Sequence, residues 1–488
     1  MLFNSYEFVF AFLPIVLLGF FLIGRRNNTL AALFLGGSSL LFYAWFNPES
    51  VPILLISIFF NYYLGLKISN NHSLLTLRFA IFCNLAVLGF FKYFNFFLYS
   101  ITSIFLFPSN IDLPLIETTL PIGISFFTFT QIAFLVDCYQ RKVFEKNWIH
   151  YLLFVTYFPH LIAGPVLHHA QMMPQFASHP YRLDRQKFAI GVVIFSIGIS
   201  KKILIANPLG EYSDVFYNNL ASSHPSSIEA WLAALAFTFQ IYFDFSGYTD
   251  MAIGISNMFG INLPINFNAP LRSRNIIEFW RRWHISLSTF LKHYLYIPLG
   301  GNRNGRVMRY RNLFITMILG GLWHGASWNF VIWGAAHGAL LSLNHLWQSY
   351  RPASITKYQS FSIFAWLLTF LLITLTFVIF RVETLSELKI VFYAMFSFSD
   401  TLSDPESIFS ISNLLTKNLT NLLLAATLIV FLEVPSHRLK LLFQRFSKNS
   451  SSRSITIKIW ALGSFSIWLI FFCINKVGEY NPFLYFQF

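Results

Sequence analysis

Charged residues are scarce in this 488-residue chain, where Asp, Glu, Lys and Arg together make up 11% of the sequence. A soluble globular protein carries about 25%, so this chain lacks the charge needed to cover a water-soluble fold of its size. Hydrophobic residues make up 56%, which excludes an intrinsically disordered chain and does not fit a coiled coil. The composition therefore indicates an integral membrane protein.

Cysteine and the common sequence motifs for cofactors are also scarce. The three cysteines, Cys83, Cys138 and Cys473, are far apart, which excludes a disulfide framework and a thiolate metal site. The chain has no P-loop and no nucleophile elbow, and the adjacent His168 and His169 lack a helical i, i+4 partner for a metal. We expect no metal and no bound cofactor.

The long apolar runs predict an all-α, polytopic membrane protein. At 56% of 488 residues there are about 270 apolar positions, and a spanning helix needs about 20, so roughly 10–12 spans are expected once loops are allowed for. No stretch is long enough for a separate soluble domain, so residues 1–488 are expected to form one transmembrane domain. Candidate spans are 6–24, 28–46, 51–68, 79–107, 119–139, 147–165, 188–209, 229–259, 312–346 (long enough for two), 361–380, 416–434 and 456–475.

Loop charge orients the predicted spans. Basic residues recur at every second connection, and acidic residues occupy the connections between them. The basic residues include Arg25, Arg26, Lys67, Arg78, Arg141, Lys142 and Lys146. The acidic residues are Glu49, Asp112, Glu117, Glu211 and Asp214. Because Lys and Arg mark the cytoplasmic side, the N-terminus is expected outside, as a retained first span. The basic stretch 438–453, with Arg438, Lys440, Arg445, Lys448 and Arg453, places the C-terminus outside too.

Two segments depart from this simple pattern. Around residues 158–165, Pro159 and Pro165 interrupt an apolar run that has basic residues on both sides. A re-entrant hairpin fits this better than a crossing, because broken backbone at membrane depth requires surrounding protein or water. Between Arg272 and Arg311, nine basic residues face one acid, Glu278. That stretch is either a long cytoplasmic loop or an anion site for a phosphorylated cosubstrate such as coenzyme A.

Within the basic stretch, residues 275–299 are predicted to form one interfacial helix. Trp280, His284, Leu287, Leu291 and Tyr294 recur at spacings of three and four, so they share an apolar face. His284 is therefore expected to point inward with Trp280. Taken by itself, this position favours a structural interpretation, a buried histidine bonded to a backbone carbonyl.

His324 lies in the most informative segment, residues 320–328, inside an apolar run and among glycines. Ionisable groups at such depth usually line a pathway or a site, and a buried neutral imidazole accepts a proton. The glycines allow a substrate or another backbone to approach. His337 and His345, further along the same hairpin, are expected to be structural. Asp244 and Asp250, six residues apart, do not share a helix face; they indicate a proton relay or a hydrogen-bonded anchor.

The sequence resembles the membrane-bound O-acyltransferase family, in its bacterial branch typified by the alginate O-acetyltransferase membrane subunit. The resemblance covers the first span to the last residue. It rests on residues 120–126, 161–165, 242–248, 278–288 (Glu-Phe-Trp-Arg-Arg-Trp-His-Ile-Ser-Leu-Ser), 299–303, 320–325 (Gly-Gly-Leu-Trp-His-Gly) and 482–488. His160 stands where the alginate enzyme is expected to carry glutamine, which leaves the acceptor polymer open.

The resemblance implies helices around a central tunnel and an enzyme, an O-acetyltransferase, of the bacterial inner membrane. The family's essential histidine falls on His324 and its second histidine on His284. Arg281 and Arg282 are expected to hold the phosphates of acetyl-CoA, the cosubstrate. The site lining expected around them is Trp280, Trp323, Asp244 and His160. Expected partners are a periplasmic acyltransferase, the machinery of an exported polysaccharide and membrane lipid, with no nucleic acid.

The chemistry of the residues supports the same assignment. A thioester is already activated, so its transfer to a hydroxyl requires a proton acceptor and the exclusion of water. His324 meets the first requirement, as a base or as a transient acyl carrier. Alternatives are D-alanyl transfer from a carrier protein, a secondary transporter with its own intramembrane histidine, and a scaffold that recruits a polymer synthase.

Overall fold

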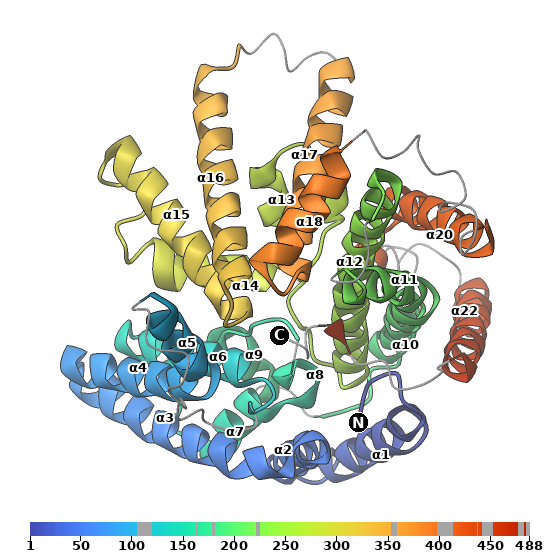
Figure 1. The fold of residues 1–488 in the computed structure, drawn as a ribbon. Helices are drawn as coiled ribbons and strands as arrows, with labels where there is room; N and C mark the ends of the chain where they lie inside the picture. Colours follow the sequence, from blue (N-terminus) through green and yellow to red (C-terminus); the bar gives the residue numbers. More distant parts are fainter. Residues whose placement is uncertain are drawn as a thin grey trace. The chain divides into compact units, whose positions relative to one another are not determined.

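The computed structural model describes residues 1–104, 120–162, 164–177, 181–220, 225–352, 359–397, 413–436, 438–441, 452–476 and 483–484. Several residues used in the sequence analysis lie outside these ranges, namely Asp112, Glu117, Ala163, Arg445, Lys448, Pro482 and residues 485–488. The described residues are helical without a strand, which confirms the all-α prediction (Figure 1).

Seven helical segments are long and apolar enough to cross a membrane. Three shorter apolar helices, Ile124–Tyr139, Leu419–Leu432 and Leu462–Asn475, accompany them in the described part of the chain. The seven are Glu7–Gly24, Asn28–Phe46, Pro48–Asn71, Leu74–Thr102, Arg185–Asn218, Ser227–Met258 and Gln359–Arg381. All seven coincide with predicted spans, so the polytopic membrane architecture is confirmed.

The chain forms two compact units. Unit 1 comprises residues 1–196, 249–264 and 457–467, and unit 2 comprises residues 197–248, 265–456 and 468–488. Unit 1 contains α1 (Leu13–Gly24), α2 (Asn28–Phe46), α3 (Val51–Asn71), α4 (Leu74–Leu88), α5 (Phe94–Ile104), α6 (Ile124–Tyr139), α7 (Trp148–Thr156), α8 (Phe158–Leu161), α9 (His169–Ala177) and most of α10 (Arg185–Ser200). A π-helical turn, Glu7–Phe12, precedes α1.

Side-chain amides join helices within unit 1. Asn61 of α3 and Asn84 of α4 donate to each other's side-chain oxygens at 3.1 and 2.7 Å, and both residues are buried. Reciprocal amide pairs satisfy polar groups that apolar surroundings would leave without partners. The pair therefore sets the register between two otherwise apolar helices.

The predicted break around residue 159 is present. Helix α7 has nine residues and ends at Thr156, and the four-residue α8 follows from Phe158. Nine residues span about 14 Å, well short of the roughly 30 Å hydrocarbon core. The stretch 147–165 is therefore not one continuous spanning helix, as the two prolines indicated.

Glu145 lies in the loop between α6 and α7, outside the spanning helices. Its carboxylate is 3.2 Å from Nε2 of His169 and accepts from the backbone N–H of Asn147 at 2.8 Å. Burial by itself would raise the pKa of Glu145, but the His169 interaction and the Asn147 hydrogen bond outweigh it and hold the pKa below the ordinary 4.5. The charged carboxylate therefore stabilises this loop.

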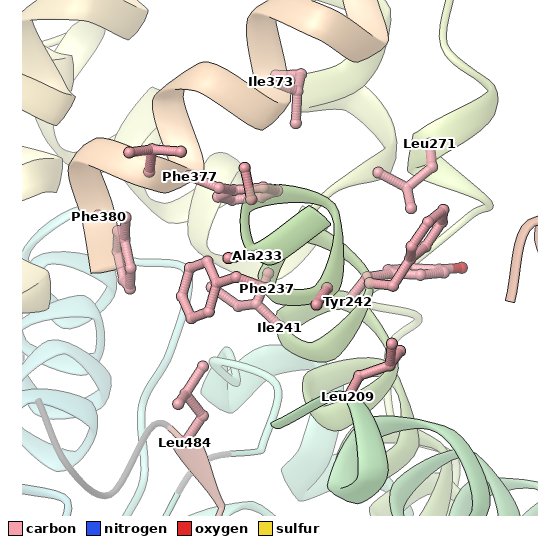
Figure 2. Close-up of a cluster of buried hydrophobic side chains, with 14 of the residues drawn as sticks. Leu209, Ala233, Phe237, Ile241, Tyr242, Leu271, Ile373, Phe377, Phe380 and Leu484 are labelled. Carbon is pink, nitrogen blue, oxygen red and sulfur yellow. The ribbon is translucent and has the colours of Figure 1, made fainter. Parts of the chain in front are cut away.

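Unit 2 is built around α12 (Ser227–Met258), whose first two-thirds belong to it. Its other helices are η4 (Lys201–Ala206), α11 (Asn207–Asn218), α13 (Ile276–Arg282), α14 (Ile285–Leu291), η6 (Lys292–Tyr296), α15 (Gly305–His324), α16 (Trp328–Tyr350), α17 (Gln359–Arg381), α18 (Leu385–Phe396), α20 (Asn413–Leu432) and the end of α22 (Ser452–Asn475). Figure 2 shows the core: Ile373 and Phe377 of α17 lie on one side of α12, and Leu209 and Leu484 lie on the other.

The stretch 312–346, predicted to be long enough for two spans, contains the hairpin of α15 and α16 (Figure 1). Neither helix is among the seven that are long and apolar enough to cross a membrane. The two helices touch backbone to backbone where glycines lie. A Cβ added to Gly321 would lie 2.1 Å from the carbonyl oxygen of Phe330, and one on Gly334 would lie 2.4 Å from that of Met317. These glycines therefore allow the backbones of α15 and α16 to lie in direct contact.

The prediction of one helix over residues 275–299 is wrong. Helix α13 ends at Arg282, and α14 starts at Ile285 after His284, whose φ of 42° and ψ of 55° are left-handed. Spacings of three and four do not reveal this break, because they persist across a short interruption. The structural cause is tertiary: the backbone of Asn266 accepts from the N–H of Ile285 at 2.9 Å, which competes with helical continuation.

Two buried ion pairs connect the helices of unit 2. Lys202 Nζ is 2.5 Å from Asp244 Oδ1, and each side chain is 3% exposed. The other carboxylate oxygen of Asp244 accepts from the backbone N–H of Leu484 at 2.8 Å. Lys201 Nζ is 2.5 Å from Glu433, which also accepts from the hydroxyl of Tyr242. Asp244 is therefore an anchor for the chain near its C-terminal end, one of the two roles predicted for it.

Candidate active site

His324 is the last residue of α15, directly before the turn into α16. It is 5% exposed, and its ring is surrounded by aromatic rings. Ring centroids lie 5.0 Å away for Trp323, 5.1 Å for Trp333 and 5.2 Å for Phe380. Phe380 also belongs to the core shown in Figure 2. The imidazole of His324 is therefore shielded from bulk water.

His284 is completely buried at the start of α14, and its protonation pattern follows from its neighbours. Asn266 Oδ1 accepts from the backbone N–H of Ser286 at 3.1 Å and from its hydroxyl at 2.9 Å. This oxygen is an acceptor, so His284 Nδ1, 3.2 Å away, must donate to it. In the neutral imidazole the lone pair then lies on Nε2. His284 is therefore oriented as a proton acceptor through Nε2.

Trp323 brings the two predicted catalytic histidines into one cluster. Its ring centroid lies 6.1 Å from that of His284 and 5.0 Å from that of His324, and the residue is 4% exposed. Phe245 of α12 packs against the His284 ring, with 4.7 Å between the two ring centroids. The structure thus assembles His284, Trp323 and His324 from two separate parts of the chain.

Trp280 lines a second layer of the same cluster, through residues of α16. Its Nε1–H donates to Nδ1 of His337 at 3.3 Å. The Trp333 ring contacts Trp280 at 5.9 Å, His337 at 4.6 Å and His324 at 5.1 Å. Trp280 is therefore connected to His324 through Trp333, and its role in lining a site stays a prediction.

The two arginines predicted to bind the donor have different surroundings. Arg281 is exposed. Arg282 is partly exposed and pairs with Glu278 one turn earlier, with 2.6 Å between Nη2 and Oε1. Both end α13, immediately before His284. Arg281 is the better placed of the two to meet an incoming anion.

His160 and Asp244 have structural contacts. His160 belongs to unit 1, where its Nε2 bonds to the backbone oxygen of Phe154 at 2.8 Å and the residue is 4% exposed. That is the arrangement of a core histidine with a satisfied side chain. Asp244 is turned toward Lys202 and Leu484, while its neighbour Phe245 faces His284.

For several residues of the site the sequence gives no signal of a function. Asn266 lies in a segment that is neither helix nor strand and that has no hydrophobic periodicity. Trp333 and His337 belong to α16, and the sequence does not predict which side chains pack against this helix. The four-residue spacing of Trp333 and His337 was visible, but apolar and aromatic residues at that spacing usually mark packing. In the described part of the chain, no group of three or more His, Cys, Asp or Glu side chains is arranged to hold a metal ion.

His284 and His324 are both buried in unit 2, at the start of α14 and at the end of α15. The profile of the membrane-bound O-acyltransferase family matches residues 50–386. This range covers most of the chain and includes His284 and His324. The chain belongs to this family and is an O-acyltransferase, as the sequence motifs indicated.

Named relatives extend the comparison over most or all of the chain. A peptidoglycan O-acetyltransferase of Helicobacter pylori is 43% identical over 424 residues, which are 80% of this chain and 79% of the relative. A probable alginate O-acetylase AlgI of Pseudomonas putida is 38% identical over 509 residues, covering all of both chains. A teichoic acid D-alanyltransferase of Bacillus subtilis is 28% identical over 269 residues, 52% of this chain and 65% of the relative.

Proposed function

We propose that this enzyme takes an acetyl group from cytoplasmic acetyl-CoA and passes it across a bacterial inner membrane for O-acetylation of an exported polysaccharide. The names of the relatives that match most of the chain support acetyl as the group and a glycan as the acceptor. Family membership favours an enzyme over a secondary transporter. The alternation of basic and acidic loops supports a cytoplasmic donor side and two periplasmic termini.

The buried cluster of His284, Trp323 and His324 carries this proposal. The acceptor hydroxyl attacks the thioester carbonyl carbon, and its proton passes to a neutral imidazole. His324 is the central catalytic residue, as base or as transient acyl carrier. His284 assists, since its Nδ1–H is bound by Asn266 and its Nε2 is the basic nitrogen. Thioester hydrolysis is suppressed because both rings are withdrawn from water, at 5% and 0% exposure.

The first experiment uses purified protein in nanodiscs with acetyl-CoA labelled in the acetyl group. Wild type is compared with His324→Ala and with the matched control His345→Ala, a half-buried histidine of α16 that contacts Arg309. We expect donor consumption to vanish in a folded His324→Ala protein and to persist in the control. Equal consumption by wild type and His324→Ala would remove His324 from the chemistry.

We propose that Arg281 contributes most to binding the phosphates of the donor. The exposed side chain of Arg281 contrasts with that of Arg282, which Glu278 already engages. Arg281→Gln is expected to raise the KM for acetyl-CoA several-fold at unchanged kcat, and Arg306→Gln, an exposed arginine of the same basic stretch, to change it less. Equal effects would indicate only a general positive field.

We propose that a periplasmic acyltransferase receives the acetyl group and delivers it to sugar hydroxyls. No sequence stretch of this chain is long enough for a soluble domain with a serine–histidine–aspartate set. Polymer acetylation that persists after deletion of every such partner would contradict this step. D-alanyl transfer is the second candidate, supported by the teichoic acid D-alanyltransferase relative. A carrier-protein thioester that is consumed in place of acetyl-CoA would favour it.

A further inference from the structure

Two residues of α16 near His324 carry buried N–H donors that have no role in the chemistry described so far: the Trp333 ring contacts that of His324, and the His337 ring contacts that of Trp333. The donors are Nε1 of Trp333 and Nε2 of His337, in residues that are 2% and 0% exposed. Neither nitrogen has a hydrogen-bond partner among the described residues. A buried donor without a partner loses its hydrogen bonds to water and gains none in return, so two in neighbouring residues require a reason.

The proton on His337 can be assigned to Nε2. Its Nδ1 accepts from the indole N–H of Trp280 at 3.3 Å. An imidazole nitrogen that accepts a hydrogen bond carries no proton, so the neutral ring must carry its proton on the other nitrogen. Nε2–H of His337 is therefore a donor, as the indole Nε1–H of Trp333 always is.

The two donors belong to one face of α16 next to the catalytic histidine. Trp333 and His337 are four residues apart in this helix, so they are neighbours on its surface. Their ring centroids lie 4.6 Å apart, and the Trp333 ring lies 5.1 Å from that of His324. The close contact of α15 with α16 at Gly321 and Gly334 holds this face against the end of α15.

We propose that Trp333 and His337 form an oxyanion site that binds the carbonyl oxygen of the acyl donor. The inference rests on the proposed acyl transfer from a thioester. Donors aimed at the oxygen on which charge develops stabilise the transition state, and such donors are most effective where water is excluded. The ligand chemistry is that of a carbonyl oxygen that becomes negatively charged. Among the described residues of the free enzyme both N–H groups lack a partner, and the substrate supplies the acceptor.

The step balances with the groups present. The acceptor oxygen forms a bond to the carbonyl carbon while its proton moves to His324, and the carbonyl π electrons move to oxygen. Trp333 Nε1–H and His337 Nε2–H donate to that oxyanion. When the carbonyl re-forms, the carbon–sulfur bond breaks, and the departing thiolate takes the proton from His324. Acceptor ester and free thiol are the products.

Conservative variants separate hydrogen bonding from packing. Trp333→Phe keeps an aromatic ring and removes one donor, and His337→Gln offers an amide oxygen to Trp280 and an amide N–H in place of Nε2. The matched control is Trp366→Phe, because the indole N–H of Trp366 donates to the backbone oxygen of Leu271 at 2.9 Å. Labelled acetyl-CoA consumption in nanodiscs gives kcat and KM, and thermal stability is measured in parallel.

We expect Trp333→Phe to lower kcat by about 10²-fold, the effect of losing one oxyanion donor. KM is expected to change little, because the removed donor has no partner among the described residues of the free enzyme. Any loss of stability should come only from the smaller buried ring. His337→Gln should retain more activity than His337→Phe. A Trp333→Phe protein with wild-type kcat, or one whose loss of kcat follows a loss of stability as in Trp366→Phe, would overturn the oxyanion site.

A spectroscopic readout tests the contact itself. Acetyl-CoA with a ¹³C-labelled carbonyl, bound to a folded His324→Ala protein, should show a carbonyl stretching band at lower frequency than in water. Adding Trp333→Phe should remove part of that shift, and an unchanged band would overturn the proposal. If wild type transfers acetyl and His324→Ala does not, the proposed function stands whatever Trp333→Phe shows. If wild type consumes no acyl thioester, both proposals fail.

Discussion

The glycine pair at the end of α15 allows a sharp test of how the site is assembled. A Cβ at Gly321 would meet the backbone oxygen of Phe330 at 2.1 Å, which is 1.3 Å short of an ordinary 3.4 Å contact. A Cβ at the adjacent Gly320 would meet only Leu291 Cδ1, at 3.2 Å, which is 0.2 Å short. The first obstacle is backbone, and the second is the end of a flexible side chain.

The two alanine variants should therefore differ in stability. Replacing a helical glycine by alanine gains about 1 kcal/mol at either position. Overpacking costs about 1–3 kcal/mol, and the upper end applies to Gly321→Ala because the hairpin must open. We expect Gly320→Ala to be neutral or slightly stabilised and Gly321→Ala to lose about 2 kcal/mol. The stabilities of the two variants are compared by the temperature at which heating abolishes the monodisperse peak in size-exclusion chromatography.

Activity should separate the variants further. His324 follows Gly321 by one helical turn, so opening the hairpin displaces its ring relative to Trp333. A displacement of about 1 Å costs roughly 10²-fold in rate. Gly320→Ala should transfer acetyl at nearly the wild-type rate. Equal stability and equal transfer in the two variants would refute the argument that backbone contact positions His324.

Three further predictions concern buried polar contacts. Asp244→Asn leaves the Lys202 ammonium buried without its carboxylate, so it should lower the free energy of unfolding by about 3–5 kcal/mol. Thermal melts should show that adding Lys202→Met recovers part of this stability. An Asp244→Asn protein as stable as wild type would contradict the pairing. Asn266→Ala removes the acceptor of His284 Nδ1 and should lower kcat by about 10²-fold, since acid–base catalysis contributes about 10²–10⁴-fold to the rate. Steady-state kinetics measures this effect, with Asn266→Asp as the conservative variant. An unchanged kcat in Asn266→Ala would contradict the tautomer assigned to His284. The pKa of Glu145 lies below 4.5 in the folded protein, so the stability that its charge contributes is complete above pH 4.5 and is lost as the pH falls through the folded pKa. Glu145→Gln should lack this loss in thermal melts from about pH 6 to 3. The same dependence of melting temperature on pH in wild type and variant would refute the prediction.

The membrane class and the α-helical fold could be predicted from composition and run length, because both depend on local properties. The 11% charge and the long apolar runs hold in any arrangement of the chain. The two prolines near residue 159 disfavour a continuous helix locally, and the structure breaks there. His324 stood out because an ionisable residue in an apolar run is exceptional wherever the run lies.

Contacts between segments distant along the chain could not be predicted from the sequence. The break before His284 depends on Asn266, 18 residues away, whose side chain also fixes the imidazole tautomer. The two N–H donors of Trp333 and His337 become exceptional only when their neighbours are known to supply no acceptor. The sequence by itself determined a helical membrane acyltransferase and singled out His324 as the candidate catalytic residue. Only the tertiary structure decided how that histidine is surrounded, because hydrogen-bond partners are chosen by packing and not by spacing along the chain.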